Sequence, residues 1–347
     1  MFGFGKSRTV TCPYCFERLA LENLGNRSST KLKCRACSTQ LPLSFLDYKS
    51  NAKDLLFSII GAKDTGKSNY IAVLINELRG AFGAQFDTVL RANDDPTSNR
   101  YRDEYYHPLY RDKTVVKVTA SALARKPEPL SYTLAFGGKS FFGRPKVSQV
   151  AFLTLFDTAG EDFNSEDTLS THNRYIFNSH GIILLLDPLQ LPQVRDRLKG
   201  SVTLPAIRTD AGDIIDRVAR LIRKAYKLRA NDLIKIPIAI AFTKCDALRP
   251  LMTPGTPLSY VSKHVGYFDE SDYEDVAGFI RALIVDWTDG ALLQQLKLGF
   301  KHYGLFGLSA LGEAPSGPKV TAIRPMRVTD PLIWHLARQR LVRHKRN

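Results

Sequence analysis

The stretch Gly61-Ala62-Lys63-Asp64-Thr65-Gly66-Lys67-Ser68 decides the fold of this chain. It fits the motif G-x-x-x-x-G-K-[ST], which requires a strand before it and a helix after it. Residues 55–60 form an almost entirely apolar run with the length of a buried strand. Residues 71–78 repeat apolar side chains at helical spacing. The sequence therefore predicts a strand, a glycine-containing loop and a helix, in that order.

This loop predicts a nucleotide-phosphate site. Gly61 and Gly66 let the backbone bend so that successive N–H groups point into one anion-sized hollow. The positive end of the helix dipole and the charge of Lys67 then face the β and γ phosphates, and the Ser68 hydroxyl is available to Mg²⁺. A glycine-rich turn that merely precedes a helix is the alternative. The expected contacts to the nucleotide are made by Lys63, Asp64, Thr65, Gly66, Lys67 and Ser68.

Composition sets the bounds of the prediction. The chain has 347 residues, of which 44% are hydrophobic, so it can bury a full core. No apolar run reaches the roughly 18 residues of a membrane span, and the N-terminus lacks the apolar stretch of a secretory signal. We therefore expect a cytoplasmic protein without a transmembrane segment. The net charge is +15, with basic excess at both ends, and such ends can meet nucleic acid, anionic lipid or an acidic partner.

Four of the five cysteines form two C-x-x-C pairs, Cys12–Cys15 and Cys34–Cys37. Two such pairs at this separation have the spacing of a Cys₄ zinc site, and the segment resembles a zinc ribbon. We expect all four thiolates to bind one Zn²⁺, whose binding energy would fold a segment too short to have its own core. A pair of disulfides is the alternative, which a reducing compartment disfavours. The basic residues around these pairs suit phosphates or a solvated face equally well.

Further along the chain, buried strands alternate with helices, which predicts an α/β fold with a mostly parallel sheet. The apolar run Val150–Phe156 ends in Asp157-Thr158-Ala159-Gly160, where an acidic residue after a strand would hold Mg²⁺ and Gly160 would let the backbone approach a γ-phosphate. Two later strands, Ile236–Phe242 and His302–Leu308, end in polar residues. These are Thr243, Lys244 and Asp246 after the first strand, and Ser309 followed by Ala310 after the second.

Residues 81–146 read irregularly, with strand candidates at Val115–Thr119 and Tyr132–Phe136. Within them, residues 92–112 are dense in Asp, Arg and Tyr, which favours a mobile or ligand-facing loop over core. Residues 247–272 read as a loop insertion, and helical patterns cover roughly 273–299.

The order of these motifs resembles the TRAFAC class of P-loop GTPases, especially the Ras-like branch, over roughly residues 54–311. With the zinc ribbon, it also resembles the prokaryotic double-GTPase type of domain, which implies signalling or defence. The expected organisation is a zinc ribbon in residues 1–50 and a Ras-like GTPase domain with enlarged loops and a basic C-terminal helix in residues 51–347.

The resemblance implies roles for the base-binding residues. Asp246 would accept hydrogen bonds from the guanine N1–H and exocyclic amine, which adenine cannot offer. Lys244 would lie along the base plane, and the backbone at Ala310 would support the guanine O6. A helix N-cap is the alternative role of Asp246.

The catalytic part departs from the family pattern. Thr114 is the expected magnesium-binding threonine, with Thr97 as the runner-up. Glu161 occupies the position where Ras-like proteins carry a water-positioning glutamine, and Lys63 and Asp64 stand where many have glycine. These departures leave nucleotide binding intact and concern the catalytic arrangement alone.

The sequence as a whole predicts a GTP-binding switch that uses GTP or GDP, Mg²⁺ and Zn²⁺, hydrolyses GTP slowly, and signals to a protein effector or activator. Self-association is a further expectation. The alternatives are an ATPase on the same fold, or a nucleotide-gated adaptor that binds nucleic acid through its basic ends.

Overall fold

The computed structural model describes residues 9–20, 32–47, 52–116, 129–139, 143–157, 174–206 and 210–345. The strands are β1 Thr9–Thr11, β2 Arg18–Ala20, β3 Leu32–Lys33, β4 Gln40–Leu41, β5 Ala52–Gly61, β6 Thr88–Ala92, β7 Leu130–Lys139, β8 Pro145–Asp157, β9 Gly181–Leu186, β10 Ile238–Phe242, β11 Tyr267–Asp269, β12 Tyr303–Gly307 and β13 Arg343–Lys345. The α-helices are α1 Ser44–Asp47, α2 Lys67–Arg79, α3 Ala81–Phe86, α4 Asp95–Arg100, α5 Arg174–Phe177, α6 Pro192–Leu198, α7 Ala211–Tyr226, α8 Glu270–Thr288, α9 Ala291–Gly299 and α10 Asp330–Arg338. A π-helix, Tyr101–Arg111, continues directly from α4.

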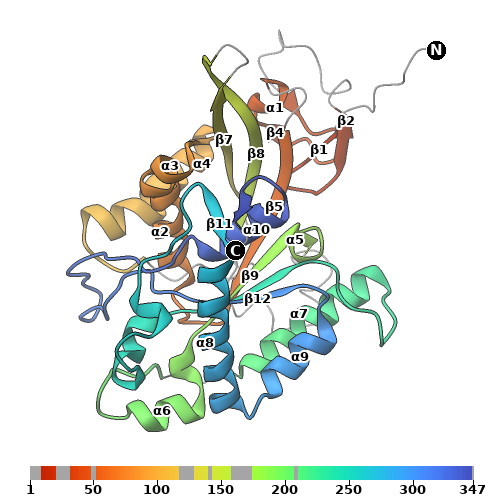
Figure 1. Ribbon diagram of the computed structural model, residues 1–347. Helices are drawn as coiled ribbons and strands as arrows, with labels where there is room; N and C mark the ends of the chain where they lie inside the picture. The colour runs from red at the N-terminus through yellow and green to blue at the C-terminus, as the bar shows by residue number, and fades with distance from the viewer. Residues whose placement is uncertain are drawn as a thin grey trace.

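In the described part of the chain, a seven-stranded sheet has the order β12-β10-β9-β5-β8-β7-β6 (Figure 1). The pairings from β12 across to β8 are parallel, whereas β7 pairs antiparallel with both β8 and β6. The parallel strands are buried on both faces, which explains why they are continuous apolar runs in the sequence. From β5 the chain first adds β6, β7 and β8 on one side of this strand, and then β9, β10 and β12 on the other side. In open α/β sheets, ligands bind at the carboxyl ends of the parallel strands where the strand order switches sides in this way.

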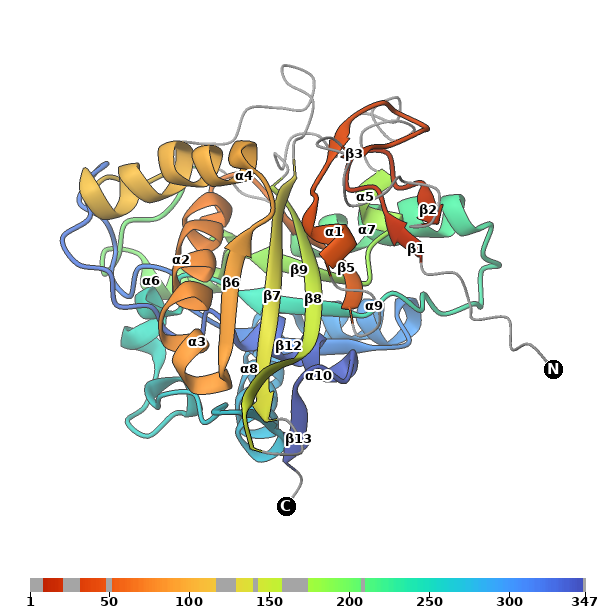
Figure 2. The ribbon, with the colours of Figure 1, turned by 90° about the horizontal axis from the view of Figure 1, so that it is seen from above.

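Alternate residues of each strand divide the core into two layers. On β5, Leu55, Phe57 and Ile59 pack with α2, α3, the π-helix and α10, and Leu56 and Ile60 pack with α5, α7, α8 and α9. The small N-terminal module of β1–β4 and α1 joins this second face through Val150 and Phe152 of β8. Figure 2 shows α2 and α3 on one side of β7 and β8 and the N-terminal module on the other.

The region between α2 and β8 differs from the prediction. The expected strand over residues 132–136 is confirmed within β7, but residues 92–112, predicted as a loop, are helical from Asp95 to Arg111. The cause is aromatic and apolar spacing: Tyr101, Tyr105 and Leu109 recur every four residues and are buried, while the charged residues between them face solvent. Of the strand expected at 115–119, Val115 and Val116 are not in a strand, and residues 117–119 lie outside the described residues.

Two further elements there were not predicted. Phe82 and Phe86, one helical turn apart, stack with ring centroids 4.4 Å apart and hold α3, and β6 adds an edge strand to β7. The expected insertion at 247–272 is largely irregular, with short 3₁₀ turns at Cys245–Leu251 and Pro257–Ser259 and the strand β11. Helices α8 and α9 match the helical pattern expected for 273–299.

Candidate functional site

The loop between β5 and α2 has the backbone conformation that its sequence requires. Gly66 lies in the left-handed region with φ 81°, directly before the first residue of α2. At Gly61, a Cβ atom would come within 2.6 Å of the Thr65 hydroxyl oxygen, so the loop closes tightly on itself only with glycine there. The Thr65 hydroxyl donates to the Ala62 carbonyl at 2.9 Å and fixes this turn. Asp64 also has a positive φ, 63°, at a position where glycine was the expected residue.

Lys244 ties the end of β10 to this loop. Its ammonium donates to the Asp64 carbonyl at 2.7 Å and to the Asp187 carboxylate at 2.7 Å. Asp187 follows β9 and has a fully buried side chain, whose other oxygen accepts from the Leu189 N–H at 2.9 Å. Gln190, also buried, donates from its side-chain amide to the Lys63 carbonyl at 3.1 Å. Polar contacts therefore join the ends of β9 and β10 to the loop that follows β5.

Asp246, which follows β10, and Ser309, which follows β12, form a second part of the site. The Ser309 hydroxyl donates to the Asp246 carboxylate and accepts from the Gly312 N–H at 2.8 Å. The backbone N–H of Cys245 donates to the Leu308 carbonyl at 3.1 Å, which joins the segments after β10 and β12. The Asp246 carboxylate is therefore held in one orientation by a hydroxyl that is itself fixed.

The loop residues 62–68, Lys244, Asp246 and Ser309 line one cavity of about 580 Å³. This volume lies within the range of roughly 300–1,000 Å³ that is usual for small-molecule and cofactor sites. Of the predicted contacts, the cavity is lined by Lys63, Asp64, Thr65, Gly66, Lys67, Ser68, Thr243, Lys244, Asp246, Ser309 and Ala310. The fold thus brings together residues from three stretches that are far apart in the sequence.

Several lining residues were not predicted. Val115 and Val116 close one side, the segment 202–205 another, and residues 311–317 contribute Leu311, Glu313 and Pro315. Asp187 and Gln190 were also missed as positioning residues. A signal for Asp187 existed, because it is an acidic residue that ends a buried apolar strand, as Asp157 does.

The remaining predicted residues lie outside the cavity lining or outside the described part of the chain. The Thr114 hydroxyl donates to the Pro108 carbonyl at 3.2 Å, and the buried Thr97 hydroxyl accepts from the Ser131 N–H at 3.2 Å. Asp157 ends β8, where its backbone is in register with Ile59 of β5; its side chain is outside the described residues. Gly160 and Glu161 also lie outside them.

The four paired cysteines converge at the N-terminal module. Cys12 and Cys15 lie in the turn between β1 and β2, and Cys34 and Cys37 in the turn between β3 and β4. The Sγ atoms of Cys12 and Cys37 are 3.8 Å apart, and those of Cys15 and Cys34 are 3.6 Å apart. Four sulfurs at about 2.3 Å from a tetrahedral Zn²⁺ would be separated by about 3.8 Å. The four ligand atoms here all lie within 4.8 Å of one another, so the cluster has the size of a zinc site.

The four cysteines of the cluster carry free thiols, and the pKa values of Cys12 and Cys37 shift in opposite directions. Burial raises the pKa of the Cys12 thiol. Burial acts in the same direction on Cys37, but its hydrogen bonds with Thr39 and with the neighbouring cysteines lower its pKa to about 6. A metal bound here would displace the remaining protons, as zinc does when thiolates form its ligand set.

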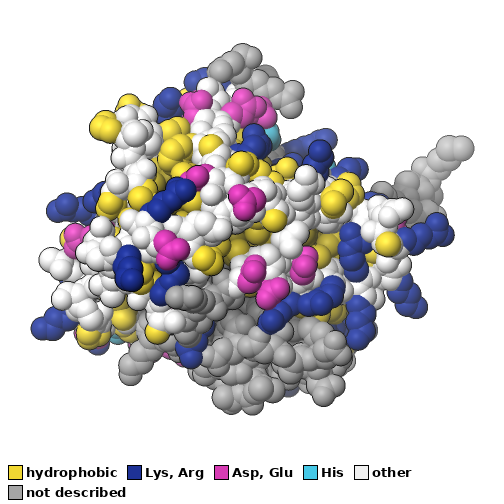
Figure 3. All heavy atoms as spheres, turned by 90° about the horizontal axis from the view of Figure 1, so that it is seen from below, with side chains coloured by type: hydrophobic (Ala, Val, Ile, Leu, Met, Phe, Trp, Pro, Cys, Tyr) yellow, Lys and Arg dark blue, Asp and Glu magenta, His cyan; other side chains and the backbone are white. Residues whose placement is uncertain are grey.

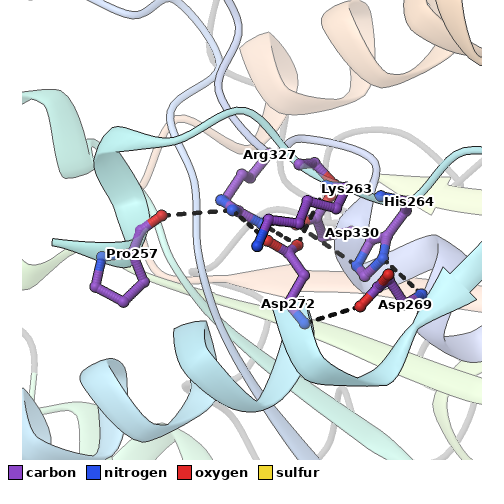
Figure 4. Close-up of polar contacts among 8 residues, drawn as sticks. Pro257, Lys263, His264, Asp269, Asp272, Arg327 and Asp330 are labelled. Carbon is purple, nitrogen blue, oxygen red and sulfur yellow. Dashed lines mark hydrogen bonds and ion pairs between the residues drawn. The ribbon is translucent and has the colours of Figure 1, made fainter. Parts of the chain in front are cut away.

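A second group of metal-binding residue types, His264, Asp272 and Asp330, is buried near the N-termini of α8 and α10 (Figure 4). The positive charge that faces these two carboxylates is the guanidinium of Arg327. The guanidinium donates to both oxygens of Asp272 at 2.8 and 3.0 Å and to Asp330 at 3.0 Å. Burial opposes ionisation of Asp272, but these bonds lower its carboxyl pKa. We therefore interpret this group as a structural ion network.

No family model matches the chain. A curated protein of Mycolicibacterium smegmatis, named "Putative ESX-1 scaffolding and assembly protein SaeC", is 26% identical over 325 residues, which cover 87% of this chain and 78% of that protein. Among solved structures, the GTP-bound GTPase-like domain of S. cerevisiae Ski7 is similar with 15% identity and a TM-score of 0.36, over 84% of this chain and 51% of that chain. The GDP-bound Roco2 RocCORdC of Methanosarcina barkeri is similar with 12% identity and a TM-score of 0.28, over 76% and 45%.

This chain spans about half the length of those two solved chains. Because the likenesses are low, the function has to be inferred from the residues of this chain. None of the helices in the described ranges is long and apolar enough to cross a membrane.

Proposed function

We propose that the protein is a guanine-nucleotide switch that binds GTP with Mg²⁺ and hydrolyses it slowly. The observation that carries this proposal is the convergence of the loop 61–68 and the Asp246–Ser309 pair on one cavity. The loop supplies N–H groups, a helix N-terminus and Lys67 for phosphates. The pair supplies a fixed carboxylate for a base.

Guanine is the base that fits this carboxylate. Guanine presents N1–H and an exocyclic amine side by side, and a carboxylate can accept from both. Adenine presents an acceptor at N1, so the base would offer Asp246 neither of these two donors, and the cost of desolvating the carboxylate would weaken ATP binding. Ser309 keeps the carboxylate in place and therefore lowers the entropic cost of this recognition.

The ATPase alternative requires Asp246 to act only as a helix cap. The helical turn Cys245–Leu251 has Lys244 at its N-cap position, without a capping hydrogen bond from that side chain. The bond that Asp246 does make is with Ser309, on another segment. This arrangement favours a role in the cavity over capping.

Ser68 and Asp157 are the residues that we propose for Mg²⁺, and Thr114 would become a third ligand once its hydroxyl releases the Pro108 carbonyl. The ion would neutralise charge on the β and γ phosphates during transfer. Ser68 lines the cavity and Asp157 ends the strand beside β5, which supports the assignment. We propose Glu161 as the group that orients water; its negative charge near the γ-phosphate would make hydrolysis slow until a partner supplies a cation.

The partner that we propose is a protein, and self-association is a second way to complete the site. The name of the M. smegmatis relative refers to scaffolding and assembly, which supports a role in a multiprotein complex. We place this activity in the cytoplasm because four cysteines that bind metal need reducing conditions. Nucleic acid remains an alternative partner; its contact would weaken steeply with salt.

A competition titration tests the nucleotide assignment. A fluorescent GDP analogue bound to the purified protein should be displaced by GTP and GDP at concentrations at least about 100-fold lower than by ATP. Phosphate release by the isolated protein should stay well below about 1 s⁻¹. Lys67→Ala is the control and should abolish binding of the probe. Equal displacement by ATP would contradict guanine recognition, and fast turnover by the isolated protein would contradict the need for a partner.

A further inference from the structure

The N-terminal module of β1–β4 and α1, which carries the four cysteines and is called the cysteine module below, contacts β8 through two aromatic pairs on the same face of the strand. Phe45 packs against Phe152, with ring centroids 4.7 Å apart, near the middle of the strand. Phe16 packs against Phe156, at 5.7 Å, at its carboxyl end. Phe156 is the residue directly before Asp157, so the second contact lies next to the acid that we propose for Mg²⁺.

Phe156 is held from its other sides as well. Its ring stacks on Tyr175 of α5, at 5.0 Å and 12° between planes. The Tyr175 carbonyl accepts from Ser58 of β5 at 3.2 Å, and β5 leads directly into the phosphate loop. The backbone at Asp157 pairs with Ile59. The end of β8 is therefore packed between Tyr175 of α5, the neighbouring strand β5 and Phe16. Of these contacts, the one with Phe16 comes from the cysteine module.

The position of Phe16 depends on the cysteine turn. It follows Cys15 directly, its N–H donates to the Cys12 carbonyl at 3.0 Å, and its φ is 64°. A bulky residue at positive φ is an outlier that persists only when its surroundings fix it. Here the surroundings are the turn that carries two cysteines of the cluster. Whatever organises that cluster thus also sets where the Phe16 ring lies.

We propose that Phe16 is a positioning residue for magnesium: the cysteine cluster, through Phe16 and Phe156, fixes the backbone of Asp157 and so tunes Mg²⁺-dependent nucleotide binding. This inference rests on the proposed function. Residues that orient a metal ligand without touching the metal change affinity because the ligand must sit within a few tenths of an ångström of its bound position. Removing the Phe16 ring removes one of the two rings packed on Phe156, so Phe156 and the adjoining strand end are held less firmly.

The experiment compares Phe16→Ala with Phe45→Ala. Both variants remove one aromatic contact between the same module and the same strand, but only Phe16 lies at the Asp157 end. The readout is the dissociation rate of a fluorescent GDP analogue over a series of Mg²⁺ concentrations, with zinc content measured on every sample. Phe16→Ala should need about tenfold more Mg²⁺ for half-maximal slowing of release. Phe45→Ala should stay within about twofold of the wild type, and Phe16→Leu should fall between.

Two outcomes overturn the inference alone: an unchanged Mg²⁺ requirement in Phe16→Ala, or an equal shift in Phe45→Ala with zinc retained. If Phe45→Ala loses zinc or unfolds, the comparison of Phe16→Leu with Phe16→Ala decides, because equal shifts in these two would contradict a role for packing at Phe156. A wild-type protein that shows no Mg²⁺-dependent binding of the GDP analogue overturns the proposed function, and this inference with it.

Discussion

At the scale of single residues, Asp187 holds the site together although it contacts no proposed phosphate or base position. Its buried carboxylate receives Lys244, which also reaches the Asp64 carbonyl. The Lys244 side chain is one-third exposed and that of Asp187 is fully buried. An amide in place of this carboxylate could accept from only one of its two donors, Lys244 and the Leu189 N–H. Asp187 is therefore the residue through which the loop 61–68 and the end of β10 keep their spacing.

We predict that Asp187→Asn weakens both folding and nucleotide binding. The loss of a hydrogen bond to a charged group should lower the free energy of unfolding by about 1–3 kcal/mol, and nucleotide affinity should fall by about tenfold. Urea denaturation and titration with a fluorescent GDP analogue measure the two effects. The control is Asp286→Asn, which breaks the surface ion pair with Arg197 and should leave both quantities unchanged. Indistinguishable results for the two variants would contradict the positioning role.

The sequence predicted the loop between β5 and α2 and the polar residues after β10 and β12, because each is a short motif that ends a recognisable strand. It did not reveal that Lys244 bonds to Asp187, or that residues 202–205 and 311–317 close the cavity. Those contacts join segments that are far apart along the chain. Their register is decided by how strands and helices pack, and one sequence carries no local signal of that.

At the scale of elements, the segment Asp95–Arg111 is helical although its local composition predicted a loop. Asp, Arg and Tyr are common in loops, and their density over 92–112 indicated one. Yet the tyrosines recur at a spacing that places them on one face, and Tyr101 donates from its hydroxyl to the Ala72 carbonyl of α2 at 2.9 Å. Burial of this aromatic face against α2 outweighs the polar composition, as tertiary packing often outweighs propensity.

The cysteine module yields a prediction about metal content. Its four sulfurs leave no open coordination position, so we expect one structural zinc per chain and no metal catalysis there. Cys37→Ser should lose the zinc and destabilise the module, while nucleotide affinity at saturating Mg²⁺ stays nearly unchanged. Elemental analysis and circular dichroism measure the outcome. The lone buried Cys245 offers the control, since Cys245→Ala should retain zinc. A zinc-free wild-type protein purified without chelator, or a mapped disulfide, would refute the assignment.

At the scale of the whole molecule, the positive charge lies mainly on exposed surfaces. Arg220 and Lys224 of α7, Lys227 directly after it, and the residues of β13 are exposed. In Figure 3, Lys and Arg side chains are densest toward the right-hand side, the side on which Figure 1 draws α7 and α9. A field of one sign speeds the approach of acidic partners and of phosphates, but it does not choose between them.

Stability of the whole fold should depend on pH through His335. His335, in α10, is completely buried against β9, and its Nε2 lies 3.1 Å from the Ile182 carbonyl oxygen. Burial lowers its pKa to about 3. Between about pH 6.5 and pH 3 the unfolded chain binds a proton on His335 that the folded chain does not. The free energy of unfolding is therefore not reduced by His335 above pH 6.5. As the pH falls from 6.5 toward 3, protonation of His335 in the unfolded chain lowers it by at most about 1.4 kcal/mol per pH unit.

His335→Phe removes this proton while keeping an aromatic ring of similar shape. Urea denaturation at several pH values between 7 and 4.5 should show a shallower loss of stability in the variant than in the wild type. Carboxylates and the cysteine cluster titrate in both proteins, so the difference between the two slopes isolates His335. Parallel slopes would show that His335 titrates normally in the folded protein.

The measurement that tests the account most directly is the base preference of Asp246→Asn. An amide offers a donor where the carboxylate offers only acceptors, so it can pair with the carbonyl that xanthine carries in place of the exocyclic amine of guanine. We predict that the wild type prefers GTP to xanthosine triphosphate and that Asp246→Asn reverses this order, with at least about a 100-fold change in the ratio of the two affinities. A variant that binds both triphosphates as the wild type does would contradict base recognition by Asp246.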